Sequence, residues 1–97
     1  MNPATTRCLE SLQARFGYTP NEVLSRSRKQ PLAWARQIAM WLLYTRTKMG
    51  YRQVAEELNR KDHGTVLHAC KVVELARGGS VAHEHRDIEA MIKLSNL

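Results

Sequence analysis

Residues 51–77 read YRQVAEELNRKDHGTVLHACKVVELAR, and this stretch decides the fold. Apolar residues recur at helical spacing over 51–58, a polar turn follows at 59–61, and Asp62 is a good N-cap for a second helix that runs to about Arg77. The inward-facing residues are expected to be Val54, Ala55, Leu58, Val66, Leu67, Cys70, Val73 and Ala76. Two helices joined by a short turn, the first of them brief, predict a helix-turn-helix over 51–77.

The rest of the chain carries helix signals and no convincing period-two alternation. Asn2-Pro3 starts an N-terminal helix that Gly17 ends, and Thr19 with Glu22 forms a capping box for a short second helix. The remaining elements are a basic loop at 25–30, a long helix at 31–48 and a C-terminal helix at 83–95, which buries Ile88, Met91 and Ile92 with Leu94 as a further candidate. The prediction is a single all-α domain over 1–97, with an N-terminal helix at 2–16 and about six helices in a small bundle.

Composition narrows the class of protein. The chain has 97 residues and a net charge of +6, which suits one domain with a polyanionic partner. Its longest apolar run, Ile38–Tyr44, is far below the roughly 20 residues that span a bilayer, and the first ten residues lack the apolar core of a signal peptide. We therefore expect a cytoplasmic protein without a membrane partner. Cys8 and Cys70 make no disulfide framework and no CxxC metal spacing, so both are expected to be buried.

An acid-free basic stretch runs from Val23 to Ala55. Its basic residues are Arg26, Arg28, Lys29, Arg36, Arg46, Lys48 and Arg52, seven of the fifteen in the chain. A solvated charge run is the plain alternative. Phosphate binding explains better why no Asp or Glu interrupts the stretch, and it favours a nucleic-acid partner.

Two strings carry a resemblance to a known family. Residues 36–40 (RQIAM) and 62–70 (DHGTVLHAC), at the spacing found here, resemble the C-terminal DNA-binding domain of DnaA, the bacterial chromosomal replication initiator family. The resemblance covers about residues 20–76. It implies an all-helical domain whose helix-turn-helix binds double-stranded DNA, without a cofactor.

The physical analysis of the second helix agrees with that implication. In helix-turn-helix docking, the amino end of the second helix meets base edges in the major groove. An Asp there can accept from a cytosine amino group, and a Thr offers a hydroxyl and a methyl suited to thymine. The resemblance implies base contacts from Asp62, His63, Thr65 and His68, a minor-groove contact from Arg28, and backbone or base contacts from Arg36 and Gln37. Arg52 and Lys61 complete the predicted DNA-binding set.

Several of these residues have other interpretations. Asp62 is also an N-cap, His63 an ordinary exposed histidine, and His68 a candidate core histidine. His63 and His68 could be metal ligands at helical spacing, but no Cys, Asp or Glu pattern completes a site, so no metal is expected. The family commonly has Thr where this chain has Gly64, and a glycine-rich turn where this chain has 59–61. These departures bear on the target sequence rather than on DNA binding.

Three function classes follow. The favoured class is a sequence-specific duplex DNA binder that regulates replication or transcription, with replication or transcription proteins as further partners. The second is an adaptor of the replication machinery acting through a Trp34 and Trp41 face. The third is a single-strand or RNA binder, which six aromatics, two of them in an apolar stripe, disfavour. No GxxxxGK[ST] loop and no catalytic arrangement is present, so neither a nucleotide nor an enzyme activity is expected. Met1 and the extra capped helix favour a stand-alone protein.

Overall fold

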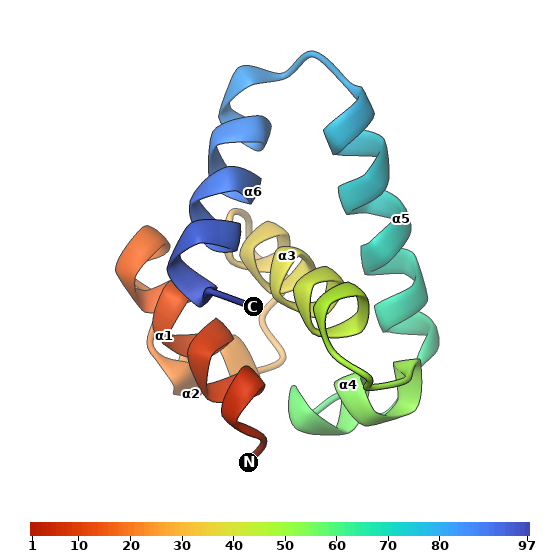
Figure 1. The fold of residues 1–97 in the computed structure, drawn as a ribbon. Helices are drawn as coiled ribbons and strands as arrows, with labels where there is room; N and C mark the ends of the chain where they lie inside the picture. Colours follow the sequence, from red (N-terminus) through yellow and green to blue (C-terminus); the bar gives the residue numbers. More distant parts are fainter.

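The computed structural model describes residues 1–97 as six α-helices without a strand (Figure 1). The helices are α1 (Pro3–Phe16), α2 (Pro20–Leu24), α3 (Leu32–Arg46), α4 (Tyr51–Glu57), α5 (Gly64–Gly78) and α6 (Ala82–Ser95). The all-α prediction of about six helices is confirmed. The long central helix is shorter at both ends than the predicted 31–48.

Local capping explains where the first two helices begin and end. The Asn2 side chain accepts a hydrogen bond from the Ala4 amide at 2.9 Å, and Gly17 closes α1 in the left-handed conformation at φ 81°. The capping box of α2 is complete, because the Thr19 side chain accepts from the Glu22 amide while the Glu22 carboxylate accepts from the Thr19 amide.

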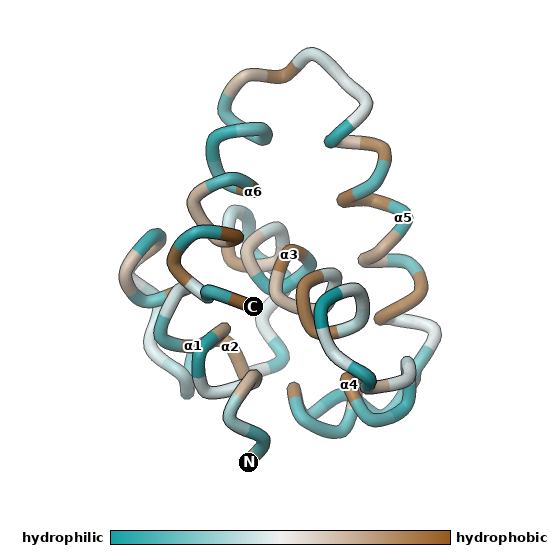
Figure 2. The backbone as a smooth tube through the Cα atoms, in the orientation of Figure 1, coloured by the Kyte–Doolittle hydropathy of each residue, from teal (hydrophilic) through white to brown (hydrophobic).

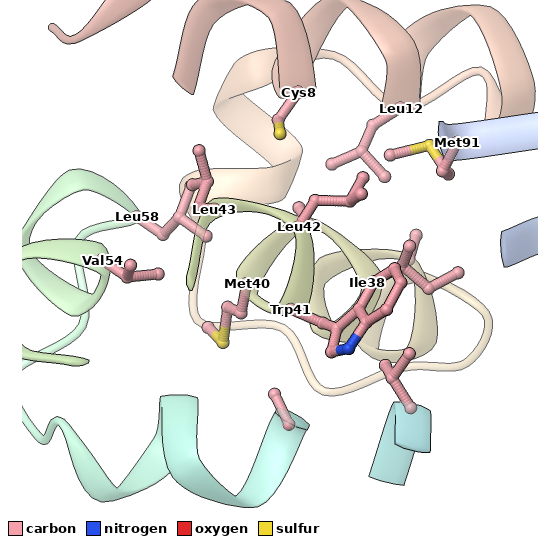
Figure 3. Close-up of a cluster of buried hydrophobic side chains, with 14 of the residues drawn as sticks. Cys8, Leu12, Ile38, Met40, Trp41, Leu42, Leu43, Val54, Leu58 and Met91 are labelled. Carbon is pink, nitrogen blue, oxygen red and sulfur yellow. The ribbon is translucent and has the colours of Figure 1, made fainter. Parts of the chain in front are cut away.

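The core is built around α3, which crosses the middle of the molecule between α5 and the α1–α6 pair (Figure 1). Ten of its fifteen residues are buried, which is typical of a helix packed on several sides. Brown, apolar segments of the backbone tube alternate with teal, hydrophilic segments along the helices (Figure 2). Figure 3 shows Cys8 and Leu12 from α1, Val54 from α4 and Met91 from α6 gathered around this helix.

Two expected core residues are instead on the surface. Leu67 is 39% exposed and Leu94 is 50% exposed. On α5 the buried face contains Val66, Ala69 and Val73. Leu67 follows Val66 directly, so its side chain is rotated by about 100° away from that face. On α6 the stripe is Ile88, Met91 and Ser95, so Leu94 points away.

The two tryptophans and the two cysteines lie inside the protein. Trp34 and Trp41 are 8% and 1% exposed, and their indole N–H groups donate to Asp87 at 2.9 Å and to Glu74 at 2.7 Å. The predicted Trp34 and Trp41 face is therefore wrong, because neither ring is available to a partner. Cys8 and Cys70 are buried and unpaired as expected, and burial raises the pKa of Cys8 to about 12. No helix is both long enough and apolar enough to cross a membrane.

Glu57 ties the first helix of the helix-turn-helix to the start of α1. Its Oε1 atom accepts from the Thr5 hydroxyl at 2.5 Å and from the Asn2 amide at 2.9 Å. The Thr5 hydrogen bond, supported by the Asn2 amide, lowers the pKa of Glu57 below its usual 4.5. A lowered pKa stabilises the fold above the unfolded-state pKa, and this stabilisation disappears as the pH falls through the folded-state value.

We expect Glu57→Gln to lower the free energy of unfolding by about 1 kcal/mol at neutral pH, since an amide accepts these two bonds less strongly than a carboxylate. The difference between wild type and variant should shrink as the pH falls below about 4.5, where the wild-type carboxylate also becomes protonated. Urea unfolding across this pH range measures it. Glu56→Gln is the matched control, because Glu56 is exposed and its side chain accepts no hydrogen bond. A difference that does not change with pH would contradict the assignment.

Candidate nucleic-acid interface

A basic concavity of about 540 Å³ lies where the loop after α2, one face of α3 and the start of α5 meet. It is lined by Arg26, Arg28, Ala33, Arg36, Gln37, Met40, Asn59, Arg60, Lys61, Asp62, Thr65 and His68. Five of these side chains are cationic and one is anionic. The concavity therefore presents a strongly positive surface, and it is built from segments far apart in the sequence.

Seven of the nine residues predicted to bind DNA line this concavity: Arg28, Arg36, Gln37, Lys61, Asp62, Thr65 and His68. The other two lie outside its lining. Arg52 is exposed on α4, and His63 is exposed immediately before α5. The fold thus brings the loop arginine, the α3 pair and the start of the second helix together, as expected from the two separate strings.

The start of α5 differs by one residue from the prediction. The N-cap is His63, which makes no side-chain cap, and the helix begins at Gly64. Asp62 still acts on the helix start, because its Oδ1 accepts from the Gly64 amide at 2.8 Å and its carbonyl accepts from the Thr65 amide at 3.1 Å. The carboxylate therefore satisfies one of the free amides of the helix end.

Gly64 allows this close approach of the Asp62 carboxylate. A Cβ atom at position 64 would lie 3.1 Å from Asp62 Oδ1, which is tighter than an ordinary contact. A larger residue here requires the carboxylate to move by a few tenths of an ångström. Gly64 and Asp62 thus shape the amino end of α5 together.

Four side chains that line the concavity are exposed and make no hydrogen bond within the protein. Thr65 and His68 are exposed on α5, and neither side chain makes a hydrogen bond within the protein. His68 is therefore not a core histidine. Arg28 and Lys61 are also exposed and donate no side-chain hydrogen bond internally. No group of three or more His, Cys, Asp or Glu side chains is placed to hold a metal ion.

Arg36 differs from these residues because it is buried, with only 6% of the residue exposed. Its Nε donates to the Val23 carbonyl at 2.7 Å and Nη1 to the Ser27 carbonyl at 2.9 Å. Nη2 donates to the carbonyls of Ser25 at 3.3 Å and Glu22 at 3.5 Å. Burial, with a smaller effect of Arg60, lowers the pKa of Arg36 to about 10, so the side chain stays cationic at neutral pH. In this structure the Arg36 side chain donates to backbone carbonyls at the end of α2 and in the basic loop rather than to a ligand.

Arg60 is the residue that sequence reasoning missed. It was assigned to a polar turn, yet it lines the concavity and its Nη2 donates to Val23 and Ser25 carbonyls. Those acceptors lie about a third of the chain away, so no local pattern could indicate the contact.

Asn59, directly before Arg60, takes the left-handed conformation at φ 58°, which Asn tolerates better than most residues. This explains how the chain turns without the family's glycines.

A small helical bundle with a short helix, a tight turn and a second helix whose amino end borders a basic concavity defines the helix-turn-helix class of proteins. The family model described as "Bacterial dnaA protein helix-turn-helix" matches residues 7–73, from α1 into α5. The chain belongs to this family, and the resemblance inferred from the two strings is confirmed.

The similar proteins are much longer than this chain. The chromosomal replication initiator protein DnaA of Trichormus variabilis is 33% identical over 85 residues, which are 84% of this chain and 18% of that protein. The protein of the same description from Bacteroides thetaiotaomicron is 36% identical over 80 residues, 80% of this chain and 17% of that protein. The chain thus spans less than a fifth of the length of these relatives. No solved structure matches it.

Proposed function

We propose that the chain binds double-stranded DNA sequence-specifically and acts in the regulation of DNA replication or transcription. The observation that carries the proposal is the convergence of the loop arginine, the turn and the exposed start of α5 on one basic concavity. Membership of the DnaA helix-turn-helix family supports it. A non-enzymatic binding role fits this arrangement, which places cationic and hydrogen-bonding side chains together.

Base readout is assigned to the amino end of α5. In this docking mode the helix lies in the major groove. Thr65 and His68 are three residues apart on α5, so they share one face of the helix and would contact base edges. Asp62 and the exposed His63 flank them at the helix start. The proposed direct contacts are therefore Asp62, His63, Thr65 and His68.

Minor-groove contact is assigned to the loop at 25–30. Arg28 lines the concavity, is exposed and makes no side-chain hydrogen bond within the protein, so its guanidinium is free to enter a groove. A narrow minor groove has an enhanced negative potential that favours an inserted arginine. Lys61, Arg52 and Gln37 are proposed to hold the adjacent phosphates, while Arg36 holds the loop.

The structure disfavours the alternative function as an adaptor of the replication machinery. Its contact was to be a Trp34 and Trp41 face, but both indoles are buried and hydrogen-bonded to carboxylates of α6 and α5. Single-strand binding has no exposed aromatic platform in the concavity, whose lining contains no aromatic ring apart from the imidazole of His68. Duplex DNA is therefore the partner that the concavity fits best.

The experiment is a selection from random duplex DNA followed by binding isotherms at increasing salt. With about four phosphates neutralised, affinity should fall about a hundredfold between roughly 50 and 200 mM salt, because bound counterions are released. Lys61→Ala should reduce the slope of log K against log salt by about 1. Arg86→Ala is the control, since Arg86 is exposed on α6 and remote from the concavity. A protein that selects no duplex, or whose binding does not respond to salt, would overturn the proposal.

A further inference from the structure

The side chain of Arg60 joins the helix-turn-helix to the segment that carries the basic loop. Its Nη2 donates to the Val23 carbonyl at 3.1 Å and to the Ser25 carbonyl. The side-chain Nδ2 of the neighbouring Asn59 donates to the Leu24 carbonyl at 3.3 Å. The turn between α4 and α5 is thereby fastened to the last residues of α2, immediately before the loop at 25–30.

Arg36 reaches two of the same acceptors from α3. Both guanidinium groups donate to the Val23 and Ser25 carbonyls. These carbonyls would therefore keep a hydrogen-bond donor if Arg60 were absent. Satisfying the backbone does not explain why a second guanidinium is present.

Keeping Arg60 in this position is unfavourable in two ways. Its Nε atom is buried without a hydrogen-bond partner, and an unsatisfied buried donor lowers stability. Burial and the like charges of Arg26 and Arg28 lower the pKa of Arg60. A buried donor left without a partner calls for an explanation beyond the fold, and a functional role supplies one.

We propose that Arg60 is a positioning residue for DNA recognition, which fixes Arg28 relative to the start of α5 through its hydrogen bonds to Val23 and Ser25. The inference rests on the proposed function. The two grooves of a duplex have a fixed separation, so a loop arginine and a recognition helix held at the matching distance bind without further ordering cost. Arg60, at the base of the turn directly before Lys61 and Asp62, connects both elements. The prediction is that minor-groove and major-groove contacts depend on each other through this side chain.

A double-mutant cycle tests this coupling on a duplex selected by the wild-type protein. Arg60→Ala should weaken binding by about tenfold or more in the Arg28-containing protein, and by little in the Arg28→Ala background. Wild type should also discriminate against a duplex whose A·T flank is moved by one base pair, and Arg60→Ala should tolerate that shift. Hydrogen exchange at the amides of Ser27 and Lys29 in the free protein should accelerate in Arg60→Ala.

Arg26→Ala is the matched control, because it removes the same charge from the same concavity and its side chain makes no hydrogen bond in the protein. It should lower affinity equally in both backgrounds and leave discrimination and exchange unchanged. Should Arg60→Ala unfold, the same cycle with Arg60→Lys decides, because lysine keeps the charge but lacks the planar guanidinium.

The outcomes separate the two proposals. If the losses from Arg60→Ala and Arg28→Ala simply add, and the shifted duplex is still rejected, Arg60 is a phosphate contact and the positioning role is overturned while DNA binding stands. If wild type selects no duplex at all, the proposed function fails and the positioning role with it.

Discussion

Arg36→Met should lower the free energy of unfolding by about 3 kcal/mol, since it removes a buried cation from its hydrogen-bond partners. Methionine retains much of the apolar stem but donates nothing to the carbonyls of Glu22, Val23, Ser25 and Ser27. Arg60 can still serve two of the four acceptors. The Glu22 carbonyl still accepts from the Ser25 amide and hydroxyl, so only the Ser27 carbonyl loses its donor, and the loop at 25–30 should become mobile there.

Chemical denaturation measures the loss of stability, and Arg26→Met is the matched control because Arg26 is exposed in the same loop. Arg36→Lys should fall between wild type and Arg36→Met, since one ammonium cannot reach carbonyls spread over six residues of chain. A change in stability below about 0.5 kcal/mol, the ordinary effect of a surface substitution, would show that Arg36 does not hold the loop.

Element ends were predictable because their signals are local. Asn2, Gly17 and the Thr19–Glu22 capping box lie within a few residues of the amides and carbonyls that they satisfy. The strong apolar stripes of α1 and α3 likewise indicated which faces meet in the core. Local hydrogen bonds and helical periodicity therefore determine most of the architecture of this chain.

Residues whose partners are distant in sequence were not predictable in the same way. Arg36 and Arg60 look like any exposed basic residues until α2 is placed against α3 and the α4–α5 turn. Trp41 looks like a partner-facing ring until Glu74 on α5 accepts its indole N–H. No residue of α4 lines the concavity, so Arg52 lies apart from the other predicted residues. How a short helix such as α4 packs against the rest of the fold is not given by its own sequence.

Thr65→Ala and His68→Ala should each relax base preference by about 1–3 kcal/mol, which is about five- to 150-fold in discrimination. Both side chains are exposed at the concavity and make no internal hydrogen bond, so their removal should leave stability and non-specific binding nearly unchanged. Leu75→Ala is the control on the same helix, because Leu75 is 78% exposed and lies outside the concavity.

Gly64→Thr should not relax base preference but shift it, toward the target of family members that carry Thr at this position. The new Cβ, 3.1 Å from Asp62 Oδ1, displaces the carboxylate and adds a methyl and a hydroxyl beside Thr65. Competition between the family's usual target and a scrambled duplex measures the ratio for wild type and for each variant. Equal ratios for wild type, Thr65→Ala, His68→Ala and Gly64→Thr would show that the amino end of α5 does not read bases, and binding would then depend on phosphate contacts alone.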